Sequence, residues 1–289
     1  RIFDYVLTKR GERVTIIGAT SGDTGSAAIE SCRGRDTIEI FILHPEGRVS
    51  EVQRRQMTTV REANIHNIAI KGTFDDCQNL VKAMFNDIQF RDSCNLSAVN
   101  SINWVRVMAQ VVYYFYGALK LCSPEDPISF SVPTGNFGNV FAGYGAKRMG
   151  LNIEKLIIGS NRNDILYRFF NDGRMLSATV EPTISPSMDI QISSNFERLL
   201  FELYGRDGKI TQTMMKSFSK NGSYEVGRKQ LEEALNLFAA QHFTDDETLA
   251  IMTQILNENK EILDPHSAIG VAAGRAKRMN HETPHISLA

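Results

Sequence analysis

The sequence reads GATSGDTG at residues 18–25 and PTGNFGN at residues 133–139. Each of these two loops follows a short apolar run and leads into a helix rich in small residues. A strand that turns into a helix through Gly, Ser, Thr or Asn directs unpaired backbone N–H groups and the positive end of the helix dipole at one point, where a phosphate or carboxylate can bind. The two loops therefore predict two anion sites, and a ligand with two anionic ends.

Around the loops, short apolar runs alternate with helical patterns, which is the βαβ rhythm of a parallel sheet covered by helices. In the first half the predicted strands are 14–17, 38–43, 65–70 and 97–99, and the predicted helices are 26–33, 51–58, 74–86 and 103–121. In the second half the predicted strands are 128–132 and 156–159, and the predicted helices are 140–149, one from 164 and one from 264, where Asp-Pro suits a helix start. The sequence predicts an α/β protein of two lobes, each a mostly parallel twisted sheet flanked by helices.

The lobes are expected at residues 1–118, a small lobe with the first loop, and at 119–289, a large lobe with the second loop. Within the large lobe the composition turns helical and charged, with breaks at Gly205, Gly208 and Gly222, which predicts a helical insertion at about 197–262. The first residues read as the last turns of a helix, and the last six read as a strand that stops before its turn. Both lobes are therefore expected to be incomplete.

Composition argues against several classes of protein. The chain of 289 residues is 42% hydrophobic with a net charge of −1. It therefore has no overall electrostatic field that would attract nucleic acid or an acidic membrane surface. Its longest apolar stretch, around 107–119, contains Gln110 and is too short to cross a bilayer. The four cysteines form no CxxC pair and have no matching histidines, which predicts reduced thiols in a cytoplasmic protein and no bound metal.

The side chains of the loops narrow the kind of anion site. Neither loop has the lysine of a P-loop or the GxGxxG spacing after a strand, which disfavours flavin and nicotinamide cofactors. The first loop adds four oxygen-bearing side chains, more than helix capping needs, and the glycines and Asn of the second suit a nest of N–H groups around a phosphate. A plain or decorated turn is the alternative for each loop.

Seven motifs in the same order resemble the threonine synthase family, in its bacterial and fungal branch, among the fold type II pyridoxal-phosphate enzymes. They are GATSGDTGSAA at 18–28, QMTT at 56–59, GTFDDCQ at 72–78, NSINW at 100–104, NRND at 161–164, SSNFER at 193–198 and DPHSAIG at 264–270. The resemblance implies a tryptophan synthase β-like fold with pyridoxal 5'-phosphate as cofactor. It also implies a lyase of threonine biosynthesis (EC 4.2.3.1) that converts O-phospho-L-homoserine and water into L-threonine and phosphate.

The resemblance also implies the binding residues. The cofactor phosphate is expected at the second loop, at Gly135, Asn136, Phe137, Gly138 and Asn139. The substrate carboxylate is expected at the first loop, at Thr20, Ser21 and Thr24 with the N–H groups that follow. Asp23 stands where relatives often carry an Asn beside the phenolic oxygen of the cofactor, and a carboxylate there could accept a proton.

The substrate phosphate is expected at Asn100, Ser101 and Arg106. Arg106 lies five residues after Ser101, on the first turns of the following helix, and an arginine fork binds phosphate with about 1.5–3 kcal/mol net per charge-assisted bond. The alternative is a solvated or structural arginine on an otherwise apolar helix. His266 lies within a family motif and is expected to be a support residue.

The catalytic residue is unknown, because the Schiff-base lysine of the family lies upstream of the first loop and this sequence begins after it. Lys9, beside Arg10 at a helix end, reads as a solvated residue. The chain by itself is therefore expected to be inactive and the parent protein active, as a monomer or weak oligomer.

Two other functions stay open. Another fold type II enzyme, such as a serine/threonine dehydratase or a cysteine synthase, would share both loops but would need no second phosphate site. A non-catalytic protein that binds a phosphorylated metabolite would need no lysine.

Overall fold

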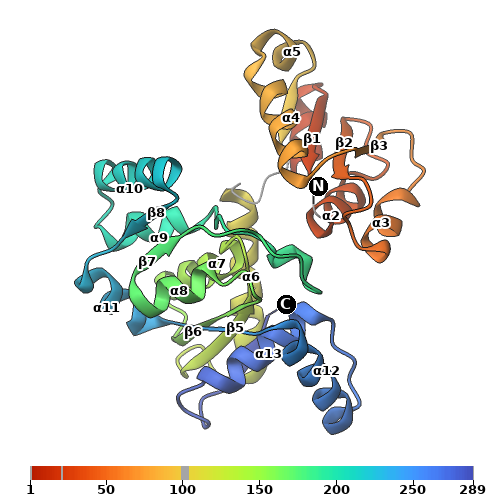
Figure 1. The fold of residues 1–289 in the computed structure, drawn as a ribbon. Helices are drawn as coiled ribbons and strands as arrows, with labels where there is room; N and C mark the ends of the chain where they lie inside the picture. Colours follow the sequence, from red (N-terminus) through yellow and green to blue (C-terminus); the bar gives the residue numbers. More distant parts are fainter. Residues whose placement is uncertain (1, 21, 99–103, 289) are drawn as a thin grey trace. The chain divides into compact units, whose positions relative to one another are not determined.

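The computed structural model describes residues 2–20, 22–98 and 104–288, without the side chains of Asp23 and Asp75. The chain divides into two compact units, Arg1–Asn100 and Ser101–Ala289 (Figure 1). The expected boundary at residue 118 falls inside α6 (Trp104–Leu121), near its end, and this helix packs along α7 (Gly138–Arg148) within the second unit. Packing therefore places α6 with the second unit, whereas the expected boundary assigned most of this helix to the small lobe.

The first unit is a four-stranded parallel sheet in the order β3-β2-β1-β4. Its strands are β1 (Val14–Ala19), β2 (Ile38–Pro45), β3 (Ile65–Ile70) and β4 (Leu96–Ala98). Its helices are α1 (Ile2–Arg10), α2 (Asp23–Cys32), α3 (Glu51–Thr58), α4 (Phe74–Asn86) and α5 (Ile88–Ser93). The α/β prediction is confirmed for this unit.

The second unit contains a four-stranded parallel sheet in the order β10-β5-β6-β9 and a small antiparallel pair of β7 and β8. The strands are β5 (Ile128–Pro133), β6 (Ile153–Ser160), β7 (Arg174–Leu176), β8 (Ser223–Glu225), β9 (Phe238–His242) and β10 (His285–Ser287). Besides α6 and α7, the helices are α8 (Ile165–Asp172), the 3-10 turn η1 (Pro186–Met188), α9 (Phe196–Leu203), α10 (Gly208–Asn221), α11 (Arg228–Leu237), α12 (Asp245–Asn259) and α13 (Pro265–Lys277). Helix α13 packs directly on β5 and β6 (Figure 1).

The stretch 197–262, expected to be helical, contains two strands as well as helices. The strand β9 pairs in parallel with β6 and forms one edge of the main sheet. Its sequence FAAQH has no β-branched residue and two alanines, which favour helix. Local propensity therefore points to the wrong structure here, and pairing with β6 overrides it.

Three features bear on the expected environment of the chain. Among the described residues, no helix is both long and apolar enough to cross a membrane. Within the same residues, no group of three or more His, Cys, Asp or Glu side chains could hold a metal ion. The four cysteines are free thiols, with Cys32 and Cys77 buried.

His285 on β10 predicts a pH-dependent stability of the second unit. Its Nε2 lies 2.9 Å from the hydroxyl oxygen of Ser131, and its Nδ1 is buried without a hydrogen-bond partner. Burial, with a smaller effect from the charge of Arg278, lowers the pKa of His285 from 6.5 to about 4. Between pH 6.5 and about pH 4, the His285 imidazole therefore binds a proton in the unfolded chain but stays neutral in the folded chain.

We expect the free energy of unfolding to fall as the pH is lowered from 6.5 to 4, by on the order of 2 kcal/mol from this group. Urea unfolding at pH 7, 6 and 5 measures the slope. His285→Gln should flatten it, whereas the same change at the exposed His281 should leave it as it was. Equal slopes in the unchanged protein and His285→Gln would contradict the assignment.

Candidate active site

The second loop connects β5 to α7 in a form that leaves the helix start uncapped. Phe137, the N-cap residue of α7, has a left-handed φ of 60° and makes no side-chain cap hydrogen bond. The N–H of Phe137 itself donates to the hydroxyl of Thr134 at 3.2 Å. The N–H groups of the first turn of α7 therefore meet no capping side chain, as an anion site at a helix start requires.

The ring of Phe137 fixes the left-handed turn from the inside of the unit. Phe137 is 0% exposed, and its ring centroid lies 5.0 Å from that of Phe196 and 5.8 Å from that of Phe238. A left-handed conformation is unfavourable for a residue with a Cβ. The buried ring offsets this cost, so the loop is shaped by packing as well as by its glycines.

Three buried side-chain oxygens without a hydrogen-bond partner among the described residues lie where the strands of this sheet end. They belong to Ser287 at the end of β10, Asn139 after β5 and Ser160 at the end of β6. An unsatisfied buried polar atom indicates a missing partner such as a ligand or water. In α/β sheets, ligands bind at the carboxyl ends of the strands. The residues present at this edge therefore fit a polar ligand with a phosphate group.

The first loop follows β1 in the first unit. Thr20 is 2% exposed, and its hydroxyl oxygen accepts the N–H groups of Gly22 and Gly25, each at 2.9 Å. Gly22 has φ 147°, a conformation that favours glycine, and makes no side-chain cap for α2. Thr20 thus shapes the turn, and Thr24 is half-buried in the first turn of α2.

Several predicted site residues lie outside the described residues, namely Ser21, Asn100, Ser101 and the side chain of Asp23. Arg106 is described: it is half-buried on α6 and makes no hydrogen bond or ion pair with any described residue. Its burial lowers the pKa of the guanidinium from its ordinary value. The same helix begins at Trp104, whose ring contacts that of Phe141 on α7 at 6.4 Å, so Arg106 lies on a helix that starts beside the start of α7.

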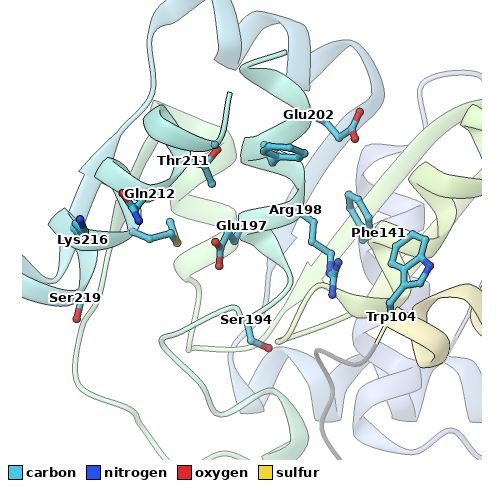
Figure 2. A pocket seen from close by; sticks show the side chains of 13 residues that line it. Trp104, Phe141, Ser194, Glu197, Arg198, Glu202, Thr211, Gln212, Lys216 and Ser219 are labelled. Atoms are coloured by element: carbon cyan, nitrogen blue, oxygen red, sulfur yellow. The ribbon is translucent and has the colours of Figure 1, made fainter. Parts of the chain in front are cut away.

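A cavity of about 950 Å³ opens next to the second loop, between α6, α7, α9 and α10 (Figure 2). Its wall carries Trp104, Phe141 and Ser194, with Arg198 over the Trp104 ring at 5.3 Å. Of the predicted site residues that the structure describes, none lines this cavity.

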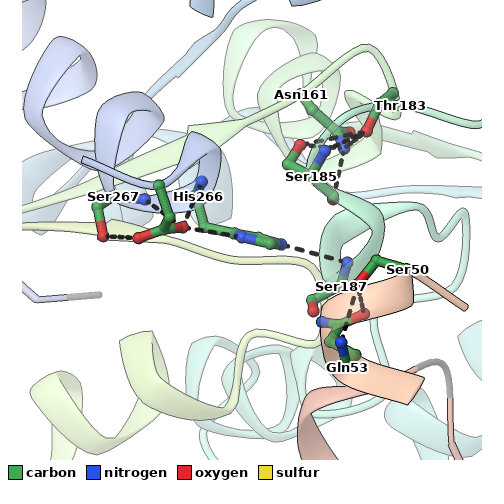
Figure 3. Close-up of polar contacts among 9 residues, drawn as sticks. Ser50, Gln53, Asn161, Thr183, Ser185, Ser187, His266 and Ser267 are labelled. Carbon is green, nitrogen blue, oxygen red and sulfur yellow. Dashed lines mark hydrogen bonds and ion pairs between the residues drawn. The ribbon is translucent and has the colours of Figure 1, made fainter. Parts of the chain in front are cut away.

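The segment 181–195, here called the brace, lies against the second loop, and the sequence predicted no role for most of it. It contacts the second loop through Ser193, Ser194 and Asn195. At its other end it is held by Asn161, which directly follows β6 (Figure 3), and by Asn163 two residues later. The motifs NRND and SSNFER could have indicated this segment from the sequence. They contain Asn, Ser and Asp without apolar periodicity, which is typical of loops held by side-chain hydrogen bonds.

His266 contacts the brace from the start of α13. Its Nδ1 lies 3.0 Å from Oδ1 of Asp264, and its Nε2 accepts the N–H of Ser187 at 3.3 Å (Figure 3). Both contacts are satisfied when the proton is on Nδ1. His266 therefore joins the start of α13 to the brace.

The chain is similar to several known proteins. Residues 1–240 match the family described as "Pyridoxal-phosphate dependent enzyme". The whole chain is 54% identical to a threonine synthase of Pseudomonas aeruginosa and 43% identical to one of Saccharomyces cerevisiae, and covers 61% of each. The whole chain also superposes on a solved structure of a pyridoxal-phosphate-bound threonine synthase from Brucella melitensis, with a TM-score of 0.95. The two sequences are 55% identical, and the match covers 62% of that chain. The chain thus spans about three fifths of the length of the relatives it matches.

Proposed function

The chain belongs to the pyridoxal-phosphate dependent enzyme family, and from this we propose that the full-length protein is a threonine synthase. The proposed reaction converts O-phospho-L-homoserine and water into L-threonine and inorganic phosphate. The observation that supports it most is the 54% identity to a threonine synthase along the whole chain. The geometry of the second loop, with its uncapped helix start, supports the same assignment.

We propose that the second loop holds the phosphate of the cofactor, through Gly135, Asn136, Phe137, Gly138 and Asn139. When bound, pyridoxal phosphate stabilises the carbanions that the reaction needs, while the protein provides placement and electrostatics. The N–H groups at the start of α7 can donate to the phosphate oxygens. Asp23 is proposed to lie beside the phenolic oxygen.

The substrate has two anionic ends, and we propose a separate site for each. The carboxylate is bound at Thr20, Ser21 and Thr24, where the Thr20 hydroxyl holds the turn in shape by accepting the N–H groups of Gly22 and Gly25. The phosphate is bound at Asn100, Ser101 and Arg106, of which Arg106 has a half-buried guanidinium without a counter-ion among the described residues. A charge of this kind is stabilised when an anion binds.

We further propose a cytoplasmic protein that acts as a monomer or weak oligomer. The four free cysteines support a reducing compartment.

An assay of the full-length protein tests the reaction. With pyridoxal phosphate and O-phospho-L-homoserine, we expect inorganic phosphate and threonine to form in equal amounts. Serine, threonine and O-acetylserine serve as control substrates. A 2-oxo acid from serine or threonine, with no phosphate release from phosphohomoserine, would replace the proposal by a dehydratase.

A further inference from the structure

We propose that the brace, residues 181–195, sets the direction of the anion-binding N–H of Asn136, and that Ser193 and Asn195 are positioning residues for the cofactor phosphate. This inference rests on the proposed binding of the cofactor phosphate at the second loop.

The brace holds the loop by its carbonyl groups. The hydroxyl of Ser193 donates to the carbonyl of Gly135 at 2.7 Å. The carbonyl of Asn136 accepts two hydrogen bonds from Asn195, one from the backbone N–H and one from Nδ2, both at 3.1 Å. The loop carbonyls thus point toward the brace.

The direction of the carbonyls fixes the direction of the N–H groups. In a trans peptide the C=O of one residue and the N–H of the next point in opposite directions. The Gly135 carbonyl therefore turns the Asn136 N–H away from the brace, and the Asn136 carbonyl does the same for the Phe137 N–H. The latter reaches the hydroxyl of Thr134 instead, as the geometry requires.

Loop and brace also touch without hydrogen bonds. A Cβ added to Gly135 would lie 2.9 Å from Cγ1 of Ile190 and 3.3 Å from Cα of Met188. Gly135 therefore lies too close to Ile190 and Met188 for a residue with a side chain, and the hydrogen bonds join the loop to the same segment.

The brace is itself anchored to the sheet by a buried polar cluster (Figure 3). Asn161, 0% exposed, directly follows β6 and has four acceptors near its Nδ2, among them Thr183 and Asp189, each at 2.8 Å. Its two N–H bonds can serve two of these at a time. The Asp189 carboxylate also accepts two hydrogen bonds from Thr183, one from its hydroxyl at 2.6 Å and one from its backbone N–H at 2.9 Å.

A second pair of contacts starts from Asn163, which exchanges two hydrogen bonds with the backbone of Glu181, at 2.8 and 2.9 Å. Hydrogen bonds at both ends of the brace thereby join the residues that follow β6 to the loop that follows β5. A rigid support of this kind is what holds a binding group in its productive geometry.

The test uses the full-length protein with three variants. Ser193→Ala removes one hydrogen bond to the loop, Ser193→Thr keeps the hydroxyl, and Asn195→Asp replaces the donor Nδ2 by an oxygen that faces the Asn136 carbonyl. The matched control is Ser217→Ala, because the half-buried Ser217 hydroxyl also joins two segments by donating to a backbone carbonyl, that of Ser223 at 3.0 Å, away from the loop.

The two readouts are the dissociation constant for pyridoxal phosphate and the 31P resonance of the bound cofactor. We expect Ser193→Ala to raise the dissociation constant about twofold to tenfold and Asn195→Asp to raise it about tenfold to a hundredfold. In both, the 31P resonance should move toward that of the unbound cofactor, whereas Ser193→Thr and Ser217→Ala should leave it in place.

Equal affinities and 31P resonances in Ser193→Ala, Asn195→Asp and Ser217→Ala would overturn the inference. If the unchanged protein binds pyridoxal phosphate and the variants behave as expected, but phosphohomoserine is not turned over, only the proposed reaction fails. If the unchanged protein does not bind pyridoxal phosphate, the inference fails together with the cofactor site.

Discussion

Phe137→Ala should lower the free energy of unfolding by roughly 3–5 kcal/mol, the usual cost of deleting a fully buried aromatic side chain. The ring fills a space between Phe196, Phe238 and Phe170, whose centroid lies 6.4 Å away. It also holds a left-handed turn at the start of α7. The same change should therefore weaken pyridoxal-phosphate binding by tenfold or more, measured by titration at a temperature where the variant is folded.

Phe169→Ala is the matched control for this experiment. Phe169 is also 0% exposed and lies in the same aromatic cluster, 4.6 Å from Phe196, but it belongs to α8 and not to the loop. It should cost a similar free energy and leave the cofactor affinity unchanged. If both variants bind the cofactor equally well, Phe137 serves the core alone.

Phe137→Gly separates packing from backbone conformation. Glycine adopts a positive φ without steric cost, whereas alanine does not. The glycine variant should thus be no less stable than Phe137→Ala, although it removes one more carbon atom and gives a more flexible unfolded chain.

The sequence predicted the elements whose ends are set by local chemistry. The bounds of α3, β3 and α4 agree with those expected. Helix α3 begins where the hydroxyl of Ser50 accepts the N–H of Gln53, and α4 begins at a capping box between Thr73 and Asp76. Signals of this kind span three or four residues, so they can be read from the sequence directly.

The features that the sequence did not predict depend on partners distant along the chain. The strand β9 exists because β6 lies beside it, and its own residues favour helix. Asn161 and Asp189 are 28 positions apart, and Asn195 and Asn136 are 59 positions apart, yet each pair is hydrogen-bonded. The motifs of the family indicated that these segments matter, but only the folded second unit gives them a role as a support for the loop.

The two predicted anion sites differ in how far the structure describes them. The second loop is complete, with its uncapped helix start and its support. In the first loop, Thr20 accepts two N–H groups of its own turn, so the carboxylate would have to use donors that follow them. The resemblance to the family implied direct binding by Thr20, and the hydrogen bonds of its hydroxyl add a role in shaping the turn.

Arg106→Ala should raise the Michaelis constant of the full-length protein for O-phospho-L-homoserine, by about tenfold to a hundredfold. This follows from the 1.5–3 kcal/mol that a hydrogen bond between charged groups contributes, at 1.4 kcal/mol per factor of ten. Cofactor affinity should stay unchanged, because the proposed cofactor site is the second loop. Arg106→Lys should be intermediate, since it keeps the charge but loses the planar fork. Arg228→Ala is the control, because this exposed arginine pairs only with Glu232 in a helical ion pair among the described residues.

Arg106→Ala should not lower the free energy of unfolding, although it weakens the binding of the substrate. The guanidinium is half-buried, its pKa is lowered by burial, and no described residue offers it a counter-ion. Holding such a group in place is unfavourable without a bound anion, so its removal should leave the free energy of unfolding unchanged or raise it. A structural arginine predicts the reverse, with lower stability and an unchanged Michaelis constant. Kinetics and urea unfolding of the same variant therefore distinguish the two roles, and an unchanged Michaelis constant would remove Arg106 from the substrate phosphate site.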